Sequence, residues 1–116
     1  MTVQDQATRP KKKLVEPASV DTRSGWVFKV GRYIARTHGE FLYGVKFTGF
    51  NDKSVILAQI SEVKNKNGVL VPMAGDADLS VSSVALDPDD NEFVLVRGWV
   101  AWGHDIDFRI TLFGIV

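Results

Sequence analysis

The C-terminal stretch, residues 93–116, constrains the fold more than any other part of this 116-residue chain. From Ile106 to Leu112 every second residue is apolar, and the residues between them are charged or hydroxylated. Successive side chains of a strand point to opposite faces, so this period of two predicts a half-buried β-strand rather than a helix. Residues 93–102 are apolar at nearly every position, which is typical of a strand covered on both faces. A short turn joins the two segments into a hairpin.

A two-stranded hairpin is at best marginally stable in water, so the rest of the chain must supply further strands and a facing sheet. Short apolar segments separated by turn residues recur along the sequence, and Lys64–Gly68, which ends in Asn-Gly, is the strongest turn signal. Ile56, Ala58 and Ile60 are expected to face inward from one of these segments. Besides the hairpin, we expect strands near residues 26–30, 41–50, 54–63, 69–71 and 79–86.

The segment between the first two expected strands, residues 31–40, is ambiguous. It fits a short helix or an irregular loop, and its polar, glycine-bounded end favours a loop. The pattern as a whole predicts an all-β fold, a six-stranded antiparallel β-sandwich preceded by a disordered or extended N-terminal tail. We place the domain at residues 23–116 and a flexible basic tail at residues 1–22.

The tail is basic because of the run Lys11–Lys13. It is either a solubilising tail or a segment that docks on nucleic acid or on another acidic surface. Three lysines are fewer than the ~6–10 phosphate contacts of a strong nucleic-acid binder, so the first interpretation is favoured.

Composition removes several classes of protein from consideration. The chain has no cysteine, so neither a disulfide nor a thiolate metal site is available. No apolar run approaches the ~20 residues that span a bilayer, which predicts no membrane insertion. The N-terminus lacks the apolar middle of a secretory signal, and a cytoplasmic, particle-associated or non-classically exported protein all stay open.

Catalytic motifs are sparse. The two histidines, His38 and His104, form no His-x-x-x-His pair, and no Gly-x-Ser-x-Gly element or glycine-rich phosphate loop is present. The acidic turn at residues 87–92 lacks the twelve-residue frame of a helix-loop-helix calcium site, and a solvated turn is the favoured interpretation. We therefore expect a protein that is not an enzyme, with no metal and no cofactor.

A binding role fits the tip of the C-terminal hairpin better. Sugars pack an apolar C–H face on an aromatic ring, and their hydroxyls need a few fixed polar partners. Trp102 can supply the ring, and His104 and Asp105 can supply the polar partners. The alternative is that the tryptophans fill a core or a subunit interface, and this alternative is stronger for the mid-strand Trp99 than for Trp102.

Several segments also follow one another in a recognisable order: Ser24-Gly25, Val45–Phe47 with Phe50, Ser54–Ser61, Leu79–Val84, a turn at Asp87–Asn91 into Phe93, Trp102–His104, and Ile110–Ile115. In this order they resemble the H-type lectin domain, the six-stranded sandwich of snail agglutinins and of the discoidin C-terminal region. The resemblance implies a parallel homotrimer with sugar sites near the subunit boundaries, typically for N-acetylgalactosamine.

The resemblance also implies site residues. Trp102 and His104 match the Trp-His of the family, although Gly103 separates them here, and Gly39-Glu40 stands for its glycine and acidic residue in the first long loop. The family's arginine on the small-residue strand has no counterpart among the serines of residues 80–83.

Our first hypothesis is accordingly a lectin-like, trimeric carbohydrate-binding module that uses Trp102, His104, Asp105, Gly39 and Glu40. The alternative is a structural, assembly or receptor-binding component of a virion or another large particle, with the basic tail as a docking segment. A histone-chaperone-like oligomer is disfavoured because no long acidic tract is present. Self-association is expected through the serine-rich strand together with Val94, Val96 and Val100.

Overall fold

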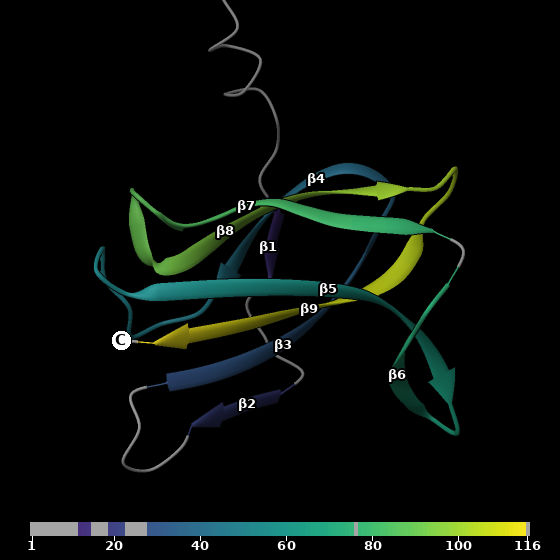
Figure 1. The fold of residues 1–116 in the computed structure, drawn as a ribbon, viewed down its shortest axis with the longest axis horizontal. Coiled ribbons are helices and arrows are strands. Elements are labelled where there is room, and N and C mark those ends of the chain that lie inside the picture. Colours follow the sequence, from purple (N-terminus) through teal and green to yellow (C-terminus); the bar gives the residue numbers. More distant parts are fainter. Residues whose placement is uncertain (1–11, 15–18, 23–27, 76, 116) are drawn as a thin grey trace, which may run out of the picture.

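The computed structural model describes residues 12–14, 19–22, 28–75 and 77–115. Within these residues the chain forms nine strands and no helix, arranged as two sheets that face each other (Figure 1). The all-β sandwich is therefore confirmed. Lys11 of the basic run and Trp26 of the expected first strand lie outside the described residues.

The strands are β1 (Lys12–Leu14), β2 (Ser19–Thr22), β3 (Phe28–Thr37), β4 (Gly39–Lys46), β5 (Val55–Lys66), β6 (Val69–Met73), β7 (Asp78–Asp87), β8 (Asp90–Ala101) and β9 (Ile106–Ile115). One sheet has the order β1-β4-β8-β7 and the other has the order β2-β3-β9-β5-β6. All neighbouring pairs are antiparallel except β1 and β4, which are parallel.

The described strands number nine where six were expected, and two of the additional strands, β1 and β2, lie within the segment 1–22 that we assigned to a tail. The expectation of a loop at residues 31–40 is wrong. Tyr33 and Ala35 are buried and alternate with outward Arg32 and Ile34, so the period of two is present, but an apolar residue on the outer face hides it. The strand ends at Thr37, and His38 forms the turn into β4.

The core lies between β3 and β9 of one sheet and β4 and β8 of the other. The expected alternation in β9 is confirmed, because Phe108, Ile110 and Leu112 are fully buried. Ile56, Ala58 and Ile60 pack against this core from β5, as expected. The buried cluster comprises Tyr33, Ala35, Phe41, Tyr43, Val45, Phe47, Phe50, Val94, Val96, Val100, Phe108, Ile110 and Leu112.

One sequence-based expectation about surfaces is wrong. Val94, Val96 and Val100 each have 0% exposure within a single chain, so they are core residues and cannot supply an interface between subunits. The outer face of β8 instead carries Trp99, which is exposed, and Leu95, which is half-buried.

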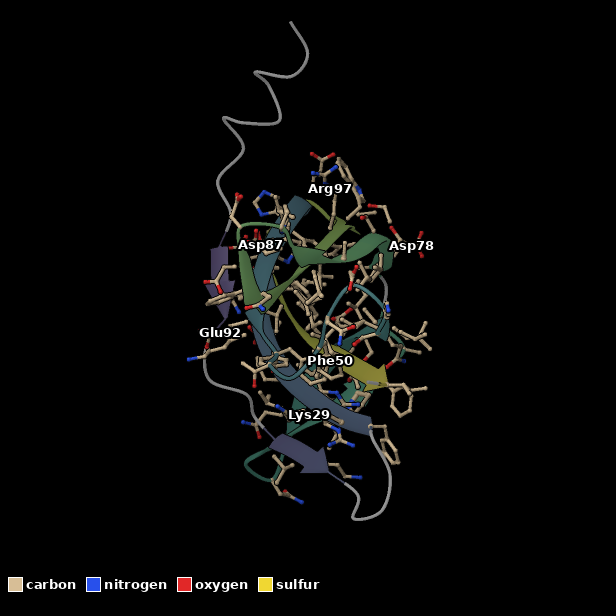
Figure 2. The ribbon with its side chains drawn as sticks, turned by 90° about the vertical axis from the view of Figure 1, so that its left-hand side faces the viewer. Lys29, Phe50, Asp78, Asp87, Glu92 and Arg97 are labelled. Atoms are coloured by element: carbon tan, nitrogen blue, oxygen red, sulfur yellow. The ribbon has the colours of Figure 1, made fainter. Side chains whose placement is uncertain are left out.

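The long connection between β4 and β5 closes one end of the sandwich. Phe50 stacks on Phe47 with ring centroids 4.7 Å apart, and Figure 2 shows Phe50 within the sandwich. A Cβ built on Gly114 would lie 2.4 Å from the Phe50 ring, so a side chain at that position would displace the ring. The glycine of β9 thus allows the connection to pack directly on the sheet.

Candidate functional site

Two turns lie side by side at the other end of the sandwich. The chain crosses from one sheet to the other at the β3–β4 turn, and it crosses back at the β8–β9 turn. β3 pairs with β9 and β4 pairs with β8, with Thr37 opposite Ile106 and Gly39 opposite Val100. The register therefore brings residues far apart in the sequence to one edge of the molecule.

A short polar contact joins the two turns. His38 Nδ1 lies 2.6 Å from Asp105 Oδ1, and the two side chains are about half exposed. An ionised carboxylate can only accept, so the imidazole donates from Nδ1. We did not assign His38 to the site from the sequence, and the period of two in β3, which ends just before it, was the signal that could have placed it opposite Asp105.

The expected aromatic plate is also at this edge. Trp102 is 38% exposed, and its indole Nε1–H donates to His104 Nε2 at 3.2 Å. The two rings meet edge to face, with centroids 5.9 Å apart at 61°. A ring nitrogen that accepts a hydrogen bond carries no proton, so this bond requires the His104 tautomer with its hydrogen on Nδ1. His104 thus braces the indole rather than standing beside it as a separate polar group.

Gly39 and Glu40 begin β4 next to these turns. Gly39 has φ +76°, a backbone conformation that a side chain disfavours, while no atom lies within 4 Å of where its Cβ would be. Its role is therefore to form the turn. Glu40 is exposed and lies directly opposite Trp99 of β8. All five residues assigned to the site from the sequence thus lie in the two turns or at the first residues of the adjoining strand.

The charge of Asp105 in the site affects a buried tyrosine of the core. Burial raises the pKa of the Tyr43 phenol, and the nearby carboxylate of Asp105 raises it further. One rung along β3 and β9, Arg36 forms an exposed ion pair with Asp107 at 3.1 Å. The edge therefore combines an aromatic ring with several charged or hydrogen-bonding groups.

No group of three or more His, Asp or Glu residues within the described ranges could hold a metal ion. The same part of the chain contains no helix long and apolar enough to cross a membrane.

A hollow of about 380 Å³ lies at the opposite end of the sandwich, and the sequence analysis did not predict it. Apolar side chains of β5 and β7 line it, and residues 51–54 form its polar rim. The polar groups of that rim are engaged with one another: the Ser54 amide donates to the Asn51 carbonyl, and the Lys53 amide donates to Asn51 Oδ1.

Comparison of the chain with protein-family models, with curated proteins and with solved structures gave no match. The resemblance to the H-type lectin domain therefore stays a prediction based on the order of the residue segments.

Proposed function

We propose that this chain is a non-enzymatic carbohydrate-binding domain whose site is the edge formed by the β3–β4 and β8–β9 turns. The observation that carries the proposal is the exposed Trp102 indole, held edge-on by His104 beside the paired His38 and Asp105. An exposed aromatic ring fixed in orientation and surrounded by polar groups is the arrangement that sugar recognition needs.

In this proposal each residue has a stated task. The C–H face of a sugar packs on the Trp102 indole. Asp105 accepts hydrogen bonds from hydroxyls, and His38 fixes its carboxylate. His104 holds the indole through Nε2 and donates to the sugar through Nδ1. The resemblance to H-type lectins suggests an N-acetylgalactosamine-type glycan.

Screening on a glycan array tests the proposal. We expect the full chain to bind a defined subset of glycans and the variant Trp102→Ala to lose that binding. Trp102→Phe keeps an aromatic face without the donor to His104, and it should retain part of the signal. Circular dichroism and a thermal melt establish that both variants fold. If folded Trp102→Ala bound as the parent does, or if the parent bound no glycan, the proposal would be wrong.

A second candidate function, an assembly component made of sister copies, is supported by the outer face of the five-stranded sheet. The strand order β3-β9-β5 places six outward apolar side chains in adjacent rows at one end of that face. Val55, Leu57 and Ile115 are 53%, 59% and 42% exposed. The set, here called the apolar outer face, comprises Phe28, Val30, Val55, Leu57, Phe113 and Ile115.

Polar groups next to the apolar outer face also lack partners. Ser61 Oγ, Arg109 Nε and Thr111 Oγ1 are buried atoms without a hydrogen bond. Ser61 pairs across the strands with Arg109, and Thr111 is the next outward residue of β9. These atoms are already inaccessible within a single chain, so a partner could not reach them, and they do not bear on an interface. The contiguous apolar patch itself is typical of a surface that another protein covers. We propose that sister copies cover it, as in the expected homotrimer.

Light scattering at micromolar concentration tests this second candidate. We expect a mass greater than one chain for the parent and a mass closer to one chain for Leu57→Asp, because a buried, unpaired charge would oppose association. Gln59→Asp, on the next outward position of the same strand, is the matched control and should change the mass less. A monomeric parent would exclude this candidate.

A further inference from the structure

Trp99 is an exposed aromatic residue that the proposed site does not use. It lies on the outer face of β8, with 49% of its surface exposed, while its neighbours Gly98 and Val100 face the other sheet and are buried. A large apolar side chain left half exposed in the middle of a four-stranded sheet needs a physical reason.

The neighbours of Trp99 across the strands are polar. Glu40 of β4 lies opposite it on one side, and Ser80 of β7 lies opposite it on the other. The next outward residue of β8 is Arg97, which pairs with Leu42 and with Ser83. A carboxylate, a hydroxyl and a guanidinium therefore surround one indole, and together they supply both donors and acceptors.

The strand beside Trp99 leaves its indole uncovered. Apart from Asp78 at its first position, the exposed outward residues of β7 are small, namely Ser80, Ser82, Ser83 and Ala85. β7 and β8 also approach closely here, since a Cβ on Gly98 would lie 2.2 Å from the carbonyl oxygen of Ser80. No long side chain of β7 can therefore fold over the ring, and the indole is bordered by polar side chains.

This surface is continuous with the proposed site. Trp99 and Trp102 are three residues apart, so their Cα atoms are separated by at most about 11 Å. Glu40 connects them, because it faces Trp99 while following directly on His38 and Gly39 of the β3–β4 turn. A ligand that leaves the turns along the start of β4 would meet Trp99 next.

We propose that Trp99 is a second sugar-stacking plate, so that the domain takes an extended oligosaccharide rather than a single terminal sugar. The inference rests on the proposed function and specifies its substrate class. The first unit stacks on Trp102, and a later unit stacks on Trp99, where Glu40 and Ser80 hydrogen-bond its hydroxyls.

The experiment compares two probes on the full chain, free N-acetylgalactosamine and oligosaccharides that end in N-acetylgalactosamine, by titration calorimetry. We expect the oligosaccharides to bind about tenfold or more tightly than the monosaccharide, as an additional aromatic contact would give. Trp99→Ala should remove this gain and leave monosaccharide binding unchanged. Trp102→Ala should abolish binding of both, and Trp99→Phe, the matched control, should keep most of the gain.

Other outcomes separate the inference from the function on which it rests. Equal affinity of the parent for the two probes, or an equal loss of both in Trp99→Ala, would show that sugar binding is real but confined to the turns. No binding of either probe would defeat both proposals. A change of molecular mass in Trp99→Ala, with the gain for oligosaccharides retained, would instead assign Trp99 to a contact between chains.

Discussion

The two outer faces of the sandwich differ in what surrounds their exposed apolar side chains. On the five-stranded sheet, six aliphatic and aromatic side chains lie in adjacent rows, and Phe28 and Phe113 have ring centroids 5.3 Å apart. On the four-stranded sheet, one indole lies between a glutamate and a serine. The first environment offers an apolar area that another protein could cover, and the second offers one plate with hydrogen-bonding groups at its sides. Equal exposure of a single residue therefore means different things on the two faces.

The largest expected effect is on the free energy of unfolding. It appears when an inward residue and an outward residue of the same strand, β9, are compared. Phe108 of β9 is fully buried, and Phe113 of the same strand is half-buried on the outer face. Phe108→Ala should lower the free energy of unfolding by ~3–5 kcal/mol, because it leaves a cavity in the core. Phe113→Ala should cost roughly half of that or less. Urea denaturation at several protein concentrations checks both values.

The same experiment can break the comparison. If sister copies cover the apolar outer face, the cost of Phe113→Ala should grow with protein concentration, whereas the cost of Phe108→Ala should not. A concentration-independent effect of Phe113→Ala would mean that this face is left to solvent.

The buried Tyr33 in the core between the two sheets leads us to expect that stability falls at alkaline pH. Burial raises the pKa of Tyr33 to about 12, and its hydroxyl donates to the Lys46 carbonyl at 2.6 Å. Between pH 10 and 12 the unfolded chain releases the phenolic proton while the folded chain keeps it, so stability falls as the pH rises. Tyr33→Phe should lose ~1 kcal/mol at pH 7 with the hydrogen bond, and it should show a shallower decline above pH 10.

Tyr43 extends this test to the site. The carboxylate of Asp105 contributes to raising its pKa, so Asp105→Asn should lower the pH at which this phenol ionises. Ultraviolet titration of tyrosinate in Asp105→Asn and in Asp107→Asn, the matched control on the next rung, measures the difference. Identical titration curves would show that Asp105 does not act on the core.

The sequence predicts a feature well when the residues that form it are close together in the chain. The alternation from Ile106 to Leu112 identified a strand because every inward position is large and apolar. The start of β3 lies in the strand expected near residues 26–30, but its continuation through residues 31–37 was missed. Ile34 breaks the polar outer face, and small or polar-tipped residues, Gly31 and Tyr33 among them, occupy inward positions. The position of Trp102 and His104 at an exposed turn was predictable, since the two are close in sequence.

Contacts between distant segments were not predictable in this way. His38 and Asp105 are 67 residues apart, and they meet only because β3 pairs with β9 in one particular register. The apolar outer face depends in the same way on the strand order β3-β9-β5, which no local pattern specifies. Val94, Val96 and Val100 were assigned to a surface because a run that is apolar on both parities does not reveal which parity faces the core.

A smaller effect, of ~1 kcal/mol, is expected at the glycine that sets the β3–β4 turn. Gly39 has φ +76°, whereas Gly103 in the β8–β9 turn has no positive φ, and neither has an atom within 4 Å of a built Cβ. Gly39→Ala should lower the unfolding free energy by ~1 kcal/mol through backbone strain alone. Gly103→Ala, the matched control, should be close to neutral. Thermal melts distinguish the two, and equal shifts would mean that the positive φ of Gly39 does not set the cost.

The smallest expected effects concern two polar pairs, Arg36–Asp107 and His38–Asp105. The first pair links β3 to β9, and the second links the residue after β3 to the residue before β9. Arg36 and Asp107 form an ion pair on adjacent strands with both side chains largely exposed, and such pairs contribute ~0.2–1 kcal/mol. Arg36→Ala should therefore change stability little and glycan binding not at all. His38→Ala should also change stability little, but it removes one hydrogen-bond partner of the Asp105 carboxylate and should weaken glycan binding several-fold. A double-mutant cycle for each pair, measured by both unfolding and binding, separates the two roles. If Arg36→Ala weakened binding as much as His38→Ala, the site would extend over the β3–β9 rung and would not be confined to the two turns.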